Sequence, residues 1–280
     1  MTRKIDILLA TYNGEDYLPD QLNSLLTQSN QDWFLLIHDD GSTDKTVNII
    51  KRYQNLYPDK IYYVDDKIIA GGAKNNFAHL MNLSTSDYIM FCDQDDIWKN
   101  NKVEITYKKM LELEKLYPDK PILIHTDLTV VDNELKLIAH SLFEYQKLPK
   151  KINNILNMIV LNNITGCTVM INKKAKEISL PIHKKAIMHD WWVGCKVKQN
   201  EGIIYFIDYS TILYRQHKKN SLGAKKYTIL LLIKRIKSAI QIIKGYKGMA
   251  EALGINAGYI KLILKKIGIT IMRFIRYKKI

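Results

Sequence analysis

The sequence lacks any uninterrupted apolar run that approaches the roughly 18–20 residues a membrane-spanning helix needs, and its best run covers only residues 229–233. No apolar segment follows the polar N-terminus, so we expect no secretory signal. Cysteine is scarce: Cys92, Cys167 and Cys195 are widely separated and form neither a metal-binding spacing nor a disulfide framework. These absences favour a cytoplasmic protein over a secreted or membrane-spanning one.

Acidic residues are nearly absent from the C-terminal part of the chain. Residues 223–280 hold 14 Lys and Arg residues and a single acid, Glu251, whereas residues 1–222 hold 28 basic and 27 acidic residues. Almost all of the formal net charge of +14 therefore belongs to the C-terminal segment. This asymmetry predicts a near-neutral main domain over 1–222 and a basic tail over 223–280 that meets an anionic partner.

Apolar residues in the tail recur at the spacing of amphipathic helices. One pattern runs from Ile229 through Ile236 to Ile243, and a second covers residues 259–277, each interleaved with basic residues. Basic amphipathic helices lie in membrane interfaces, with apolar side chains inserted and cations facing anionic headgroups. We therefore predict peripheral attachment to the inner face of the cell membrane. The alternative is that these stripes pack against the main domain or join two copies as a homodimer.

The main domain alternates short apolar runs with segments of helical periodicity. The predicted strands cover 5–10, 33–37, 61–64 and 88–92, with helical patterns between them. This alternation predicts an α/β fold with a mainly parallel sheet and helices on both faces. Ligands of such sheets bind beyond the carboxyl ends of the strands, where the polar clusters 11–14, 39–42 and 93–96 fall. After residue 120 we expect further strands over 122–125, 128–131, 164–171, 203–207 and 212–214, and a helix over 190–198.

Three carboxylates, Asp93, Asp95 and Asp96, lie within four residues directly after a predicted strand. Carboxylates this close repel each other unless a cation neutralises them. Mg²⁺ and Mn²⁺ prefer carboxylate oxygens and keep positions open for phosphate oxygens, so the cluster suits a metal-bound diphosphate. The alternative is a helix N-terminus that these acids cap, Asp96 above all.

A second acidic cluster, Asp39 and Asp40 before a Gly-Ser-Thr-Asp segment, follows another predicted strand. Thr43 or Asp44 is suited to cap the next helix, and this composition is typical of a turn. Two acids before the glycine need a further reason. A carboxylate at a strand end can accept hydrogen bonds from a nucleotide base or ribose.

Three segments in this order, each after a predicted strand, resemble the family 2 glycosyltransferases with the GT-A fold: Ala-Thr-Tyr-Asn-Gly at 10–14, Asp-Asp-Gly-Ser-Thr-Asp at 39–44 and Asp-Gln-Asp-Asp-Ile-Trp at 93–98. Segments 163–167, 189–192 and 214–217 resemble the bacterial rhamnosyltransferase-like branch, so the similarity covers about residues 3–222. The resemblance implies an inverting, metal-dependent enzyme. It would move rhamnose or a hexose from a nucleotide-diphosphate donor to a saccharide acceptor in surface polysaccharide biosynthesis.

The resemblance also implies roles for single residues. A divalent ion, Mn²⁺ or Mg²⁺, would be held by Asp95 and His217, and Asp190 would be the catalytic base. Gln94 replaces a small residue or an acid of many relatives, which bears on branch identity more than on chemistry. The residues expected to bind the nucleotide sugar are Thr11, Tyr12, Asn13, Asp39, Asp40, Asp93 and Gly166, and those expected on the acceptor side are His189, Trp191 and Trp192.

Elementary chemistry agrees with these roles. An acceptor hydroxyl is a poor nucleophile and needs a carboxylate to take its proton, and a cation stabilises the charge that develops on the leaving diphosphate. Each residue also has a structural alternative. The alternative for Asp190 is a cap at the start of a helix, His217 lies among surface lysines, and rings that pack in a core look the same in sequence as rings that stack on sugars.

The identities of the donor and the acceptor are implied only by the resemblance to the family branch. It favours dTDP-rhamnose, with UDP-hexoses open, and a growing saccharide or lipid-linked oligosaccharide as acceptor. A non-catalytic scaffold that binds saccharides or nucleotide sugars is the main rival. A nucleic-acid-binding protein is disfavoured, because the main domain is near neutral and the tail is rich in Ile and Leu. A nucleotidyltransferase would normally carry a glycine-rich phosphate loop, which the segment 11–14 is not.

Overall fold

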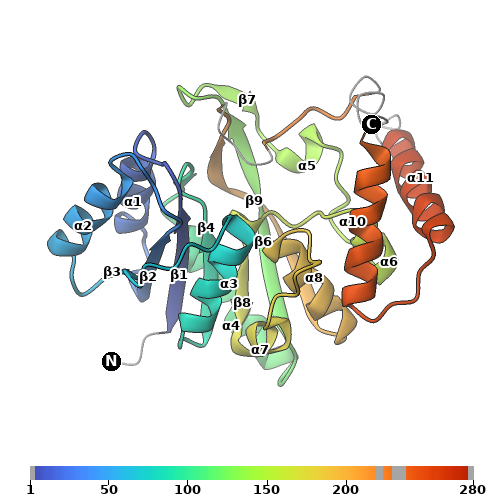
Figure 1. Cartoon of the computed structure of the whole chain (residues 1–280), viewed down its shortest axis with the longest axis horizontal. Coiled ribbons are helices and arrows are strands. Elements are labelled where there is room, and N and C mark those ends of the chain that lie inside the picture. Colours follow the sequence, from blue (N-terminus) through green and yellow to red (C-terminus); the bar gives the residue numbers. More distant parts are fainter. Residues whose placement is uncertain (1–3, 218–222, 229–237, 277–280) are drawn as a thin grey trace.

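A computed structural model of the chain describes residues 4–217, 223–228 and 238–276. Its centre is a nine-stranded sheet in the order β3-β2-β1-β4-β8-β6-β9-β5, with β7 paired to β6 (Figure 1). The parallel strands β1, β2, β3 and β4 form its N-terminal half, and β8 joins the two halves in antiparallel pairing with β4 and β6. The strands are β1 (Ile5–Thr11), β2 (Trp33–Asp39), β3 (Ile61–Tyr63), β4 (Tyr88–Cys92), β5 (Ile97–Trp98), β6 (Ile122–Val131), β7 (Leu137–Ala139), β8 (Met170–Asn172) and β9 (Ile203–Arg215).

Helices cover both faces of the sheet, because alternate apolar residues of each buried strand point to opposite sides. On one face, Leu9 and Leu35 pack in a cluster with α1 (Leu18–Leu26), α2 (Thr46–Leu56) and α4 (Lys102–Leu116). On the other, Leu8 and Leu36 pack with α3 (Ala73–Leu83) and α8 (His189–Gln199). The predicted α/β architecture is thereby confirmed. The short helices are α5 (Leu142–Tyr145), α6 (Ile155–Val160), η1 (Gly166–Thr168) and α7 (Lys173–Ser179).

The second half of the main domain differs from the expected strand pattern in three places. The run 164–171, predicted as one strand, instead forms the 3₁₀ turn η1 before the short β8, because the Thr168 hydroxyl and amide both bond to the carbonyl of Thr165. The two strands expected over 203–207 and 212–214 are one strand, β9, and those over 122–125 and 128–131 are one strand, β6. The β6–β9 ladder shifts register between Thr126 and Thr129, so the polar residues interrupt the apolar pattern without ending either strand.

The tail forms two helices, α10 (Ala239–Ala252) and α11 (Tyr259–Arg276), beside α6 and α8 (Figure 1). Met249 and Ala250 of α10 are fully buried in the same cluster as α8. Leu262 and Ile269 of α11 join that cluster, while the outer side of α11 stays exposed. Residues 229–237 of the first predicted tail helix, and Tyr277 of the second, lie outside the described residues.

None of the described helices combines the length and the apolar character that crossing a membrane requires.

Candidate active site

A cavity of about 530 Å³ opens beyond the carboxyl ends of β1, β2 and β4. Its floor comes from the strand ends, and its walls come from α3 and from the start of α8. It contains most of the predicted site residues. The lining residues are Ala10, Thr11, Tyr12, Asp40, Ile69, Gly71, Gly72, Ala73, Asn76, Phe77, Asp93, Gln94, Asp95, Thr165, Gly166, Met188, His189, Asp190 and Tyr214.

The end of β2 carries two aspartates with different surroundings. Asp39 is buried and accepts hydrogen bonds from the Thr11 hydroxyl at 2.8 Å and from the Ser42 amide at 2.7 Å, so its carboxylate braces the neighbouring loop. Asp40 lines the cavity and accepts hydrogen bonds from the amides of Gly71 and Gly72 at 2.9 and 2.6 Å. Asp40 thus faces the cavity, whereas Asp39 lies behind the loop and supports it.

The loop after β1 is fixed by hydrogen bonds to residues from distant segments of the chain. Gln94 accepts a hydrogen bond from the Tyr12 amide at 2.8 Å and donates one to the Tyr12 carbonyl at 2.9 Å, which pairs this loop with the acidic loop. A Cβ at Gly14 would lie 2.3 Å from the side-chain oxygen of Gln94, so a larger residue here would displace Gln94 and its hydrogen bonds to Tyr12. Asn13 does not line the cavity; it adopts a φ of 46° and accepts a hydrogen bond from the Thr43 amide. Gln94 therefore has a structural role that the sequence did not reveal.

The capping alternatives are resolved by the start of α2 and by the position of Asp96. The N-cap of α2 is Lys45 and not Thr43 or Asp44, although the Asp44 carboxylate still accepts the amide of Thr46, the first residue of the helix, at 2.9 Å. Asp96 does not cap a helix, contrary to expectation: it is fully buried and accepts the amide of Arg215 from β9 at 3.2 Å. Burial and the neighbouring carboxylates raise the pKa of Asp96 well above its ordinary value.

Asp95 and His217 meet although 122 residues separate them. The His217 Nε2 lies 2.8 Å from an Asp95 carboxylate oxygen, and both side chains are largely buried. The Tyr17 ring lies against the imidazole, with ring centroids 4.4 Å apart. Burial and the charges of Asp95 and Asp190 raise the pKa of Asp93, so the three carboxylates share one electrostatic environment.

Asp190 lies on the first turn of α8 and lines the same cavity as Asp40. Its carboxylate accepts a hydrogen bond from the Trp191 amide at 2.7 Å and another from the Asn162 side chain at 3.3 Å. Burial raises the pKa of Asp190 to about 6, and these two donors oppose the rise. Asp190 is not the N-cap of α8, which is Met188.

Gly166 and His189 lie in contact below Asp190. A Cβ at Gly166 would lie 2.9 Å from the His189 Nε2, so only glycine permits this approach. His189 is buried between Phe77 and Phe91, with ring centroids 4.1 and 4.9 Å away, and burial lowers its pKa to about 3. Among the described residues neither ring nitrogen has a hydrogen-bond partner, so the ring is neutral and its polar atoms stand at the cavity wall.

The two tryptophans after Asp190 do not line the cavity. The Trp191 indole donates to the Met158 carbonyl at 2.6 Å and lies edge-on to Tyr246 of α10. Trp192 is buried and donates to the Ser179 carbonyl at 2.8 Å. Both indoles pack against the hydrophobic core, so the expectation that Trp191 and Trp192 shape an acceptor pocket is wrong and the packing alternative holds.

Several cavity residues were not singled out in the sequence. Asn76 and Phe77 belong to α3, Ile69 and Gly71 to the loop before it, and Tyr214 to β9. A helical pattern shows only that one face of α3 is apolar, and it does not show which turn approaches the strand ends. The Gly-Gly pair at 71–72 is the one local signal, because paired glycines indicate a loop.

The family model described as Glycosyl transferase family 2 matches residues 6–179. The chain belongs to this family. The family 2 model thus covers the strand ends, both acidic loops and the Gly166 region, and these are the segments whose motifs indicated the family.

Individual relatives agree with this assignment. The dTDP-rhamnosyl transferase RfbG of Shigella flexneri is 28% identical over 270 residues, which cover 89% of this chain and 86% of RfbG. The putative teichuronic acid biosynthesis glycosyltransferase TuaG of Bacillus subtilis is 32% identical over 110 residues, 39% of this chain and 42% of TuaG. The chain is therefore a glycosyltransferase of family 2, similar to a rhamnosyl transferase over most of its length.

Solved structures share the fold at low sequence identity. S. aureus TarS in complex with UDP-GlcNAc superposes with a TM-score of 0.60 at 15% identity, over 94% of this chain and 70% of that one. The mannosyltransferase PcManGT of Pyrobaculum calidifontis, in complex with GDP-Man and Mn²⁺, superposes with a TM-score of 0.61 at 12% identity, over 95% of this chain and 70% of that one. The GT-A fold expected from the motifs is thereby confirmed.

Proposed function

We propose that this chain is an inverting, metal-dependent glycosyltransferase that moves a sugar from a nucleotide-diphosphate donor to a saccharide hydroxyl. One observation carries the proposal: Asp93, Asp95 and Asp190 line the same cavity as Thr11 and Asp40, and His217 contacts Asp95. This arrangement places a proton acceptor and the residues of a cation site in one cavity, whose volume of about 530 Å³ is large enough for a ligand.

The donor set fits a divalent cation. Burial and the charge of Asp95 raise the pKa of Asp93, so a cation held by these residues would relieve the repulsion between the two carboxylates. Carboxylate oxygens and one imidazole suit Mn²⁺ or Mg²⁺, and Asp95 with His217 would hold the ion. When bound, such an ion stabilises the negative charge that the leaving nucleoside diphosphate gains.

Asp190 is suited to take the proton of the acceptor hydroxyl. A pKa of about 6 leaves its carboxylate mostly ionised at neutral pH yet basic enough to accept a proton as the hydroxyl attacks. Asn162 and the Trp191 amide orient the carboxylate. Attack from the face of the sugar opposite the leaving group inverts the anomeric carbon without a covalent intermediate. Thr11 and Asp40 are placed to hold the nucleotide base, supported by Asp39.

The printed substrates of the relatives guide the choice of donor. RfbG is named a dTDP-rhamnosyl transferase, while TarS and PcManGT are solved with UDP-GlcNAc and GDP-Man. RfbG is 28% identical over 86% of its length, whereas TarS and PcManGT are 15% and 12% identical over 70% of theirs, so dTDP-rhamnose is the donor we propose first, and UDP-hexoses second. The acceptor we propose is a growing saccharide, free or lipid-linked, in surface polysaccharide biosynthesis.

A panel of nucleotide sugars tests this function directly. In the presence of Mn²⁺ or Mg²⁺ and without an acceptor, we expect the purified protein to hydrolyse dTDP-rhamnose slowly. This hydrolysis should stop when a chelator removes the ion. Turnover of a UDP-hexose instead would revise the donor only. Binding of a nucleotide sugar with no turnover in any metal would support the non-catalytic scaffold.

The outer side of α11 supports attachment to a membrane surface. Ile260, Leu264, Ile267, Ile271 and Ile275 recur on one side of the helix and are 49–75% exposed. They stand on the part of the chain that has almost all of the excess positive charge. An apolar stripe flanked by cations suits insertion among anionic headgroups, and we propose an anionic bilayer as its partner.

Replacing Ile260, Leu264, Ile267 and Ile271 by Ser should weaken sedimentation with vesicles containing phosphatidylserine by more than about 100-fold, since full burial of each side chain is worth about 1.5–3 kcal/mol. Donor hydrolysis should be unchanged. Leu116→Ser, on an equally exposed leucine of α4, is the matched control and should bind vesicles normally.

Deleting the whole tail is a poor test, because Met249 and Ala250 belong to the core. Equal vesicle binding by wild type and the serine variant would refute the membrane proposal. If instead the wild type is a dimer that the variant converts to a monomer, α11 is a subunit interface.

A further inference from the structure

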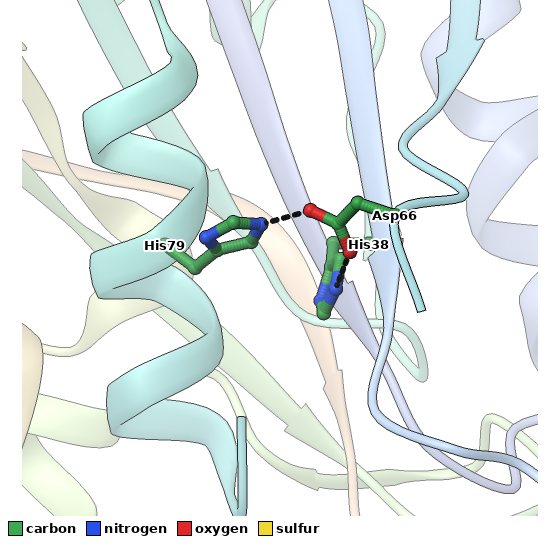
Figure 2. Close-up of side chains that lie close together, drawn as sticks. All are labelled: His38, Asp66 and His79. Carbon is green, nitrogen blue, oxygen red and sulfur yellow. Dashed lines mark hydrogen bonds and ion pairs between the residues drawn. The ribbon is translucent and has the colours of Figure 1, made fainter. Parts of the chain in front are cut away.

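Two histidines and an aspartate meet outside the cavity, between β2, α3 and the loop that follows β3 (Figure 2). The His38 Nε2 lies 3.3 Å from one carboxylate oxygen of Asp66, and the His79 Nε2 lies 2.6 Å from the other. In Figure 2 both rings point toward the carboxylate, one from β2 and one from α3. The side chain of His38 is 1% exposed, whereas His79 and Asp66 are 20% and 30% exposed. The cluster is therefore buried at His38 and accessible to solvent at His79 and Asp66.

The hydrogen bonds of Asn76 determine the tautomer of His38. The Asn76 Nδ2 donates to the His38 carbonyl at 3.1 Å, which fixes the orientation of the amide. Its Oδ1 therefore faces the His38 Nδ1 at 2.8 Å and can only accept, so Nδ1 bears the proton. In a neutral ring the Nε2 lone pair then points at the Asp66 carboxylate, and two acceptors cannot bond. The buried Nε2 needs either a second proton or a metal ion.

We infer that His38, Asp66 and His79 form a binding site for a transition metal of the Zn²⁺ type, separate from the divalent site of the cavity. Two imidazoles and a carboxylate are a known zinc donor set, with the fourth position left to water, and imidazole favours Zn²⁺ over Mg²⁺. The donor atoms lie within 4.8 Å of one another. Zn–N bonds of about 2.0 Å place tetrahedral ligands about 3.3 Å apart, so small side-chain shifts suffice. Asn76 supplies the partner that orients a metal-bound histidine.

The site's position gives it a consequence for the cavity. Asp66 lies near the start of the segment 65–72, whose Ile69, Gly71 and Gly72 line the cavity and whose two glycine amides hold Asp40. A metal at Asp66 ties this segment to β2 and to α3. Its occupancy should therefore stabilise the fold and hold the wall beside Asp40. The inference does not rest on the proposed transfer reaction, because none of its three ligands lines the cavity.

Co²⁺ titration of the full chain tests the site, since tetrahedral Co²⁺ absorbs strongly in the visible range whereas an octahedral oxygen site does not. An Asp95→Ala background removes the cavity site from the measurement. We expect one Co²⁺ per chain, displaced by Zn²⁺, and a rise in melting temperature with Zn²⁺. His79→Gln retains a donor for Asp66 but no imidazole, so it should bind Co²⁺ at least about 10–100-fold more weakly. His140→Ala, on an exposed histidine elsewhere, should bind as the wild type does.

The His79→Gln variant separates metal from proton. Without metal, it should melt close to the wild type, and with Zn²⁺ only the wild type should shift. Asp66→Asn provides a second ligand change and should lose the absorption as well. Failure of the wild type to bind Co²⁺ or Zn²⁺, or equal binding by His79→Gln, would assign the cluster to a proton-held ion pair and overturn the inference.

Discussion

Replacing Asp190 by Asn is expected to lower kcat for sugar transfer by about 10²–10⁴-fold, the contribution typical of a general base. Asparagine keeps the shape of the side chain and an oxygen for the Trp191 amide, but it cannot take the acceptor's proton. Affinity for the nucleotide sugar should be retained, because the role proposed for the carboxylate is toward the acceptor hydroxyl and not toward the donor. Product formation with a saccharide acceptor measures the first quantity, and calorimetric titration of the donor measures the second.

Glu201→Gln makes the same carboxylate-to-amide change on an exposed residue just beyond the other end of α8. It should leave both quantities unchanged. Ordinary turnover by Asp190→Asn would remove the base assignment, whereas loss of donor binding would move Asp190 to the donor side of the site.

The pH dependence of the wild type supplies an independent check. A base must be ionised to act, and burial raises the pKa of Asp190 to about 6, so kcat/KM should fall as pH drops through about 6. Asn162 donates to the carboxylate and favours its ionised form. Asn162→Ala should therefore move the acidic limb of the profile to higher pH. An unshifted limb would mean that another group controls it.

The sheet and the strand-end acids were predictable from the sequence because their signals are local. A buried parallel strand is a short apolar run, and the residues directly after it fall at the ligand-binding edge. Asp40, Asp93 and Asp95 were placed at that edge by this rule alone, and the structure brings all three to the cavity. The pairing of Asp95 with His217 was not visible in spacing and came only from the family resemblance.

The sequence could not decide which neighbours in α8 face the cavity. Adjacent helical residues point about 100° apart, so Asp190 and Trp191 cannot both project in one direction. Which of the two faces the cavity depends on how α8 packs against α3 and α6, and this packing is a tertiary property. The same limit explains the segment 164–171: its residue types suit a strand, but Thr168 bonds back to the Thr165 carbonyl and forms a turn there.

Removing Asp95 is expected to abolish most of the metal-dependent transfer. Asp95→Ala takes away one carboxylate of the proposed cation site and leaves His217 without that oxygen. A bound ion is worth several kcal/mol of transition-state stabilisation, so kcat/KM should fall by at least about 10²–10³-fold. The wild-type melting temperature should rise with Mn²⁺, and that of the variant should not.

Asp87→Ala removes an exposed acid just before the opposite end of the same strand, β4, and should behave like the wild type in both measurements. Each variant removes one aspartate, so the comparison of Asp95→Ala with Asp87→Ala separates the effect of the residue's position from the effect of losing one negative charge. Metal loss predicts that raising Mn²⁺ restores part of the activity of Asp95→Ala, whereas a fold defect predicts no rescue. Turnover by Asp95→Ala at wild-type rates in chelator would show that the crowded carboxylates serve the nucleotide without an ion, and the metal would leave the proposed reaction.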